Sequence, residues 1–125
     1  MEWQDSYALG LPRMDDTHRE FVACVARLSA ADSEKVVDAL EDLLAHAKEH
    51  FAQEERWMED SHFQPVFCHA DEHARVLDSL KKIIVMARNN PGLGGIVAKE
   101  LENWFIQHAA TMDAVLAAHL RQTNH

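Results

Sequence analysis

The sequence predicts an all-α protein, an up-down-up-down antiparallel four-helix bundle with an N-terminal arm. Four long stretches repeat apolar residues every three or four positions, the pattern of a helix that buries one face. Proline and glycine fall almost entirely between these stretches, and no alternating β-branched run indicates a strand. A chain of 125 residues suits one core, so we expect residues 1–125 to form a single domain.

The arm is expected at residues 1–15 and the first two helices at about 17–30 and 33–60. Asp32 and Ser33 are suitable N-caps for the second of these helices. The first helix should bury His18, Phe21, Val25 and Leu28. The buried stripe of the second is expected to be Val36, Leu40, Leu43, Ala47, His50, Glu54 and Trp57.

The last two helices are expected at about 65–89 and 95–121. Pro65 suits the first turn of the third helix, and the fourth should begin after the glycines at 92, 94 and 95. The third stripe is expected to be Val66, His69, His73, Val76, Leu80, Ile83 and Ala87. The fourth is expected to be Val97, Leu101, Trp104, His108, Met112 and Val115.

Charge and composition exclude several classes of protein. Asp and Glu number 21 against 12 Lys and Arg, and the net charge of −9 disfavours both nucleic acid and anionic membranes as partners. We see no secretory signal, and no apolar run reaches the roughly 20 residues of a membrane span. A cytoplasmic location is therefore expected. Cys24 and Cys68 lack CxxC spacing, so we interpret both as buried free thiols.

Histidine is the unusual residue, with nine in the chain, and every predicted core stripe contains at least one. His50 with Glu54 and His69 with His73 are spaced i, i+4, which puts both members of each pair on one helix face. In an alternating bundle, the polar residues of all four stripes fall at the same end. The seven that should converge are His18, His50, Glu54, His69, His73, His108 and Asp113.

Burying these groups without partners would cost on the order of 1 to 3 kcal/mol each, and more for a lone carboxylate. A pair of metal ions removes that cost. Five imidazoles and two carboxylates exceed what one tetrahedral zinc ion binds, so the set indicates two metals bridged by the carboxylates.

The motif order His, HxxxE, HxxxH, HxxxxD resembles the hemerythrins, and more closely their bacterial single-domain members. The resemblance covers nearly the whole chain, in the segments EWQDSYALGLPRMDDTH, HFAQEERWM, PVFCHADEH and WFIQHAATMD. It implies two iron ions with a bridging oxo or hydroxo group. One iron would be held by His69, His73 and His108 and the other by His18 and His50, with Glu54 and Asp113 bridging and an open position for O₂ on the second.

We therefore expect reversible O₂ binding, for carriage, storage or delivery, and not an enzyme. Neutral imidazoles favour high iron oxidation states less than carboxylates do. The O₂ pocket should be lined by Phe21, Phe51, Trp104 and Phe105. Two alternatives remain open: sensing of oxygen, redox state or nitric oxide through a protein partner, and a diiron peroxidase or oxidase. A monomer is expected.

Two positions depart from the family pattern. Thr17 stands where a glutamine is usual, and Phe105 where leucine is common, which changes the volume of the pocket. Asp113 follows His108 by five residues, which on a regular α-helix turns it about 140° away from the ligand face. We therefore predict a π-helical widening there.

Four histidines fall outside the ligand set. His46 should be solvated or bonded to a neighbour of the site, and His62 should be exposed in a turn. His119 suits a helix-dipole contact, and His125 carries no inference.

Overall fold

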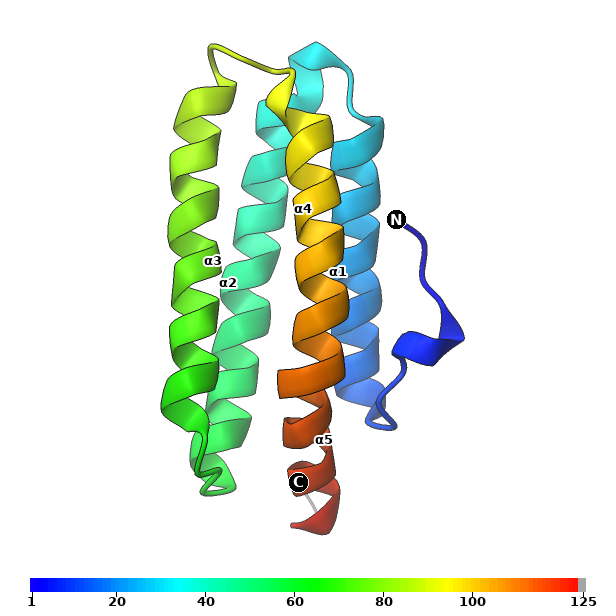
Figure 1. Ribbon diagram of the computed structural model, residues 1–125, viewed down its shortest axis with the longest axis vertical. Coiled ribbons are helices and arrows are strands. Elements are labelled where there is room, and N and C mark those ends of the chain that lie inside the picture. The colour runs from blue at the N-terminus through cyan, green and yellow to red at the C-terminus, as the bar shows by residue number, and fades with distance from the viewer. Residues whose placement is uncertain (124–125) are drawn as a thin grey trace.

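The computed structural model describes residues 1–123 and confirms an all-α antiparallel four-helix bundle (Figure 1). Its helices are α1 (Pro12–Ala30), α2 (Val36–Asp60), α3 (Val66–Ala87) and α4 (Leu93–His108). The last continues through a π-helical segment, η3 (Ala109–Asp113), into α5 (Ala114–Gln122). Single 3-10 turns form at η1 (Asp5–Tyr7) and η2 (Ser33–Lys35). The chain runs up α1, down α2, up α3 and down α4 and α5.

Two helices begin earlier than the sequence pattern predicts. α1 starts at Pro12 and not near residue 17, because proline needs no amide partner in the first turn and its φ is already helical. α4 starts at Leu93 and not near residue 95, and it contains Gly94, although the sequence pattern predicts this glycine before the helix. At Gly94 a Cβ would lie 3.1 Å from both γ-methyls of Val36, so this glycine allows α4 to pack closely on the start of α2.

The core consists of two apolar clusters separated along the bundle axis. The larger begins at the polar layer with Phe21, Phe51 and Phe105 and also contains Leu40 and Leu80, among others. The smaller closes the opposite end with Met14, Trp57, Met58, Phe63, Leu116, Ala117 and Leu120. On α1 and α2, the predicted ligands lie in sequence between members of the two clusters. The polar layer is therefore capped by apolar side chains on both sides.

The core face changes phase after His108. Met112 is only half-buried and Val115 is 55% exposed, so the predicted stripe is wrong beyond His108. Asp113, Leu116 and Leu120 face the core instead. The physical reason is the π-helical segment, whose extra residue per turn moves every following side chain by one position.

α2 begins at Val36 and not at residue 33, because Ser33–Lys35 form a 3-10 turn. Its N-cap is Lys35, so the predicted caps Asp32 and Ser33 do not cap it.

Two smaller expectations also fail. Cys68 is exposed, whereas Cys24 is buried as predicted. On α3, Ile84 is buried and Ile83 only half-buried, so the stripe moves by one position near the end of the helix. Neither change affects the polar layer.

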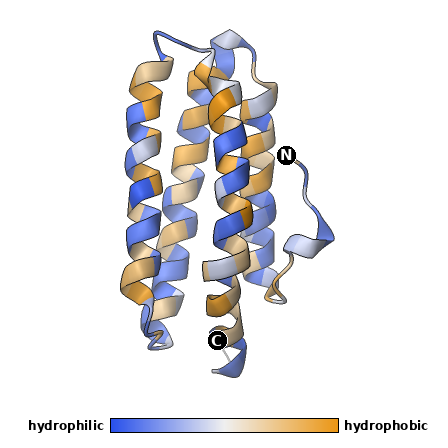
Figure 2. Cartoon of the chain, viewed as in Figure 1, coloured by the Kyte–Doolittle hydropathy of each residue, from blue (hydrophilic) through white to orange (hydrophobic). Residues whose placement is uncertain are grey.

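Hydrophilic residues occur along every helix (Figure 2). Among residues 1–123, no helix is long and apolar enough to cross a membrane.

Candidate metal centre

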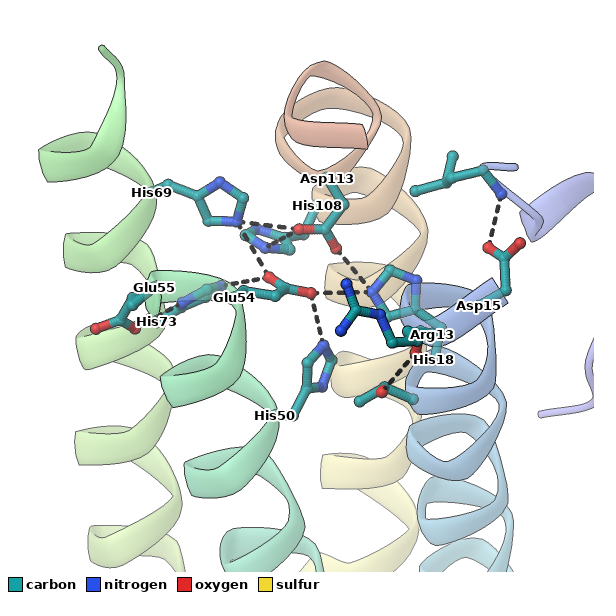
Figure 3. A network of polar contacts seen from close by, with 12 residues as sticks. Arg13, Asp15, His18, His50, Glu54, Glu55, His69, His73, His108 and Asp113 are labelled. Atoms are coloured by element: carbon teal, nitrogen blue, oxygen red, sulfur yellow. Dashed lines mark hydrogen bonds and ion pairs between the residues drawn. The ribbon is translucent and has the colours of Figure 1, made fainter. Parts of the chain in front are cut away.

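All seven predicted ligands meet in one buried layer between the four helices (Figure 3). None is more than 5% exposed. Each helix contributes through its own periodicity, with the i, i+4 pairs of α2 and α3 pointing inward from facing turns. The contributors are His18 from α1, His50 and Glu54 from α2, His69 and His73 from α3, His108 from α4 and Asp113 from η3.

Glu54 lies at the centre of this layer, with its two oxygens facing opposite groups of histidines. Its Oε1 is 3.4 Å from Nε2 of His69 and 3.3 Å from Nε2 of His73. Its Oε2 is 3.3 Å from Nε2 of His18 and 2.9 Å from Nε2 of His50. One carboxylate thus serves both sides of the layer.

Asp113 divides its oxygens in the same way. Its Oδ1 is 3.0 Å from Nε2 of His69 and 3.1 Å from Nε2 of His108. Its Oδ2 is 3.2 Å from Nε2 of His18. The π-helical segment predicted from the spacing is confirmed at Ala109–Asp113, and it places Asp113 on the same face as His108.

The ligand atoms form two groups, within each of which they lie no more than 4.8 Å apart. One contains Glu54, His69, His73, His108 and Asp113, and the other contains His18, His50 and Glu54. These are the only groups of this kind within residues 1–123, and Glu54 belongs to both. The chain therefore offers two adjacent positions for metal ions, one richer in histidine than the other.

Several buried ligand atoms have no hydrogen-bond partner, and this tests whether the site fits metal ions. Nε2 of His69, His73 and His108 and one oxygen each of Glu54 and Asp113 are unpartnered although they face one another. Two ligands at right angles on a metal, each about 2.1 Å away, lie about 3.0 Å apart. The observed nitrogen to oxygen separations of 2.9–3.4 Å match this spacing. The residues present fit metal ions at both positions.

Without metal, the two carboxylates favour the protonated form of neighbouring histidines. Burial opposes the charge on His18, but hydrogen bonds and charge from Asp113 and Glu54 outweigh it and raise its pKa to about 10. Burial also opposes the charge on His69, but the carboxylates of Asp113 and Glu54, with oxygens 3.0 and 3.4 Å from its Nε2, outweigh it and raise its pKa to about 9. Burial would raise the pKa of Glu54, but the charge of His50 and hydrogen bonds from His18 and His50 hold it well below the usual value. The pKa of Asp113 is also lowered.

These shifts predict that metal binding releases protons. Near pH 7.5 the metal-free protein carries protons on His18 and His69, and both must leave before the imidazoles bind metal. Zinc titration in a weak buffer should release about two protons per chain at pH 7.5, one each from His18 and His69, and progressively fewer as the pH rises through 9 to 10. Proton release that stays the same over this pH range would contradict the raised pKa values of His18 and His69.

The same shifts set how the stability of the metal-free fold depends on pH. Because the folded pKa values of His18 and His69 are raised, their stabilising contribution is complete below pH 6.5 and is lost as the pH rises through 9 to 10. Urea unfolding of the metal-free protein should therefore show declining stability over this range, while metal affinity increases.

The structure adds two outer carboxylates that the sequence pattern did not single out. Glu55 accepts a hydrogen bond from Nδ1 of His73 at 3.0 Å, which orients Nε2 toward the metal position. Glu72 accepts one from Nε1 of Trp104 at 2.8 Å. Trp104 in turn stacks on His108 at 4.5 Å between ring centroids. Glu55 and Glu72 each precede or follow a ligand in sequence and so lie off its face, where periodicity gives no signal.

The four aromatic residues predicted around the O₂ position lie next to the histidines. Phe105 packs edge-on against His18 at 5.3 Å, and Phe21 lies 6.2 Å from His50. Phe51 stacks on His73 at 4.0 Å, and Trp104 approaches Phe51 at 5.9 Å. Phe21, Phe51 and Phe105 are at most 1% exposed. The layer therefore has an aromatic wall on its larger-cluster side.

The remaining histidines lie outside the layer. His46 is half-buried with Nδ1 3.7 Å from Glu20, and burial lowers its pKa. His62 is exposed, as predicted. His119 bonds through Nε2 to the carbonyl of Ser61 at 2.9 Å and ties α5 to the turn after α2. His125 lies outside the described residues. Thr17 bonds to the Arg13 carbonyl of its own helix at 2.9 Å.

Comparison with known proteins agrees with this arrangement. The family model described as the hemerythrin HHE cation binding domain matches residues 9–120. A bacteriohemerythrin from Ralstonia nicotianae is 32% identical over 98% of this chain and 90% of its own length. The chain belongs to the hemerythrin family.

Two further relatives extend the likeness. A bacteriohemerythrin of Pseudomonas aeruginosa is 26% identical over 90% of this chain and 76% of its own length. A myohemerythrin from Riftia pachyptila is 24% identical over 89% of this chain and 86% of its own length. Family membership makes this hemerythrin a metal-binding protein of the oxygen-binding type.

Proposed function

We propose that this hemerythrin binds O₂ reversibly at a centre of two non-haem iron ions. The observation that carries the proposal is the division of each carboxylate between two groups of histidines. Oε1 and Oε2 of Glu54 face different groups, and so do Oδ1 and Oδ2 of Asp113. Two carboxylates placed in this way are suited to bridge a pair of ions rather than to bind one.

In this proposal the two ions divide the histidines unequally. His69, His73 and His108 would hold one ion, and His18 with His50 the other, with a solvent-derived oxo or hydroxo bridge between the ions. The ion with fewer histidines would keep a free position, which suits an external ligand. When bound, the iron pair supplies that position and the electrons that binding O₂ requires.

The chain's own residues favour binding over further reaction. Five imidazoles against two carboxylates make a donor set with little negative charge, unlike the carboxylate-rich centres of ferritin-like proteins. Among the four aromatic residues of the wall, only Trp104 carries a polar hydrogen, and it donates that hydrogen to Glu72. The wall therefore offers no free proton to a bound ligand, and it keeps water away.

The proposal predicts that His50→Ala abolishes O₂ binding, because the ion with fewer histidines would lose one of two. The matched control is His46→Ala, which removes a half-buried imidazole one turn earlier on α2. Its Nδ1 faces Glu20, and its ring packs beside that of His50 at 5.6 Å, but it belongs to neither ligand group. Anaerobically reduced, iron-loaded samples are titrated with O₂ and followed by visible absorption. The control should bind O₂ like the wild type. Undiminished O₂ affinity in His50→Ala would contradict the ligand assignment.

Several finer expectations stay predictions. They are the cytoplasmic location, the monomeric state, the absence of enzymatic activity and the absence of nucleic-acid binding. Sensing through a protein partner is the main competing function. It predicts that the oxidised state persists and that a partner responds to it, whereas a carrier must return to its reduced state each time O₂ leaves.

A further inference from the structure

The N-terminal arm, residues 1–11 in the structure, contacts the bundle near both of its ends. Near its end, the amide of Leu9 donates to Oδ1 of the buried Asp15 at 2.7 Å, and the Leu9 carbonyl accepts a hydrogen bond from Arg121 of α5. Gly10 then turns the chain with a φ of 81°, a conformation that favours glycine. Near its start, the guanidinium of Arg19 lies 4.7 Å from the ring of Trp3. The arm runs beside α1 (Figure 1), and these contacts attach it to the bundle.

Tyr7 is the point at which the arm reaches toward the metal layer. Its ring packs edge-on against Phe105 at 5.8 Å, and Phe105 packs edge-on against His18 at 5.3 Å. Trp3 packs edge-on against Tyr7 at 5.6 Å between ring centroids. The rings form a continuous line from the arm to the histidine of the group with fewer histidines.

Tyr7 lies between the buried ring of Phe105 and solvent. Phe105 is 1% exposed and Tyr7 is partly exposed. Phe105 is also stacked on Phe21 at 5.3 Å, so it is held between Phe21, His18 and Tyr7. Of these three neighbours, Tyr7 alone belongs to the arm, where it ends the short η1 turn, so it could be withdrawn without disturbing a helix of the bundle.

We propose that Tyr7 is a positioning residue that holds Phe105 over the metal position with fewer histidines and thereby controls how fast external ligands and water enter. The inference rests on the proposed diiron function. Without the Tyr7 ring, the Phe105 side chain can move outward and becomes exposed to solvent. Entry and exit of a ligand should then accelerate together, because a barrier is lowered while the bound state keeps its contacts.

The test uses azide, a small anion, as the probe of the diferric protein. In Tyr7→Ala, azide entry and exit should both rise about tenfold, with an equilibrium constant near that of the wild type, and the O₂-loaded form should autoxidise faster. Tyr7→Phe keeps the ring and should retain wild-type rates. Leu44→Ala is the matched control, because Leu44 is partly buried, packs against the larger cluster and belongs to neither ligand group. It should lower the urea midpoint without changing the azide rates.

A second variant keeps the inference testable if Tyr7→Ala fails to fold. Arg121→Ala removes the hold on Leu9 without touching Phe105, and it should accelerate azide entry to a smaller extent. In the metal-free protein, it should also speed hydrogen exchange at the Leu9 amide, which Asp15 protects.

The outcomes separate the two proposals. Unchanged azide rates in Tyr7→Ala and Arg121→Ala would overturn the role of the arm and leave the diiron proposal standing. A changed equilibrium constant with an unchanged entry rate would indicate a structural role only, and would also overturn it. A wild type that binds azide but not O₂ contradicts the proposed function while the azide rates still report on the arm. A wild type that binds no iron contradicts both.

Discussion

Glu54→Ala is expected to prevent the metal pair from assembling. Within residues 1–123, Glu54 is the only residue that belongs to both ligand groups, and each of its oxygens faces a different one. Its removal leaves the group of His18 and His50 without its carboxylate from α2, so we expect at most one metal ion per chain. Metal analysis after loading with iron or zinc measures this directly.

The same variant should destabilise the metal-free fold. Glu54 is 1% exposed and its carboxylate offsets the charge of protonated histidines, so removing it leaves those charges buried. Loss of one partner of a buried ion pair costs about 3–5 kcal/mol, to be measured by urea unfolding near neutral pH. Glu54→Gln preserves the volume and tests metal binding if the alanine variant does not fold.

Glu55→Ala is the control for both measurements. Glu55 is the adjacent carboxylate, but it is partly exposed, belongs to neither ligand group and bonds to the outer nitrogen of His73. This variant should still bind two metals, with a weaker hold on the ion at His73. Two metals bound at wild-type affinity in Glu54→Ala would contradict the bridging assignment.

Deletion of Ala110 is expected to leave the bundle folded, although deletions within helices are usually severe. Ala110 is exposed and lies in the π-helical segment, which contains one residue more than an α-helical turn requires. Without it, Asp113 follows His108 at the i+4 spacing of a regular helix, and Leu116 and Leu120 remain on the core face. The free energy of unfolding should change by about 1 kcal/mol or less.

Deletion of Asn103 is the matched comparison. Asn103 is also exposed, but it lies in the regular part of α4, where one residue fewer rotates everything beyond it by about 100°. Either Leu101 or His108 must then leave its place. We expect a loss of about 4 kcal/mol or more, together with loss of metal binding. Circular dichroism, urea unfolding and metal content compare the two deletions, and equal effects would contradict the account of the π-helical segment.

The fold followed from the sequence because its signals are periodic. Proline and glycine separate four apolar stripes, and the i, i+4 pairs of His50 with Glu54 and His69 with His73 fix which face points inward. Alternating direction then places their levels at one end of the bundle. These features could be predicted because apolar and ligand residues recur at helical spacing within each helix.

Phase and helix ends were harder to predict. The spacing of His108 and Asp113 predicted the π-helical segment correctly. The predicted stripe nevertheless ignored the shift that this segment causes, so it placed Val115 on the core face where the structure has Leu116. Gly94 looked like a helix breaker because its role, room for Val36, depends on another helix.

Side-chain contacts between different helices, or between the arm and the bundle, could not be predicted from the sequence. Glu55 and Glu72 lie off the ligand face, and their partners His73 and Trp104 come from other helices. The line from Tyr7 through Phe105 to His18 depends on how the arm crosses the bundle, which no periodicity encodes. Such contacts are decided by packing between segments that are distant in sequence.

The most direct test of reversible O₂ binding is repeated cycling of one iron-loaded sample. The protein is reduced without oxygen, and its iron content is measured. It is then exposed to O₂ and flushed with argon several times while its absorption spectrum is recorded. The account predicts two irons per chain and full return of the reduced spectrum after each flush. Conversion to a persistent diferric spectrum with release of hydrogen peroxide in the first cycle would contradict it.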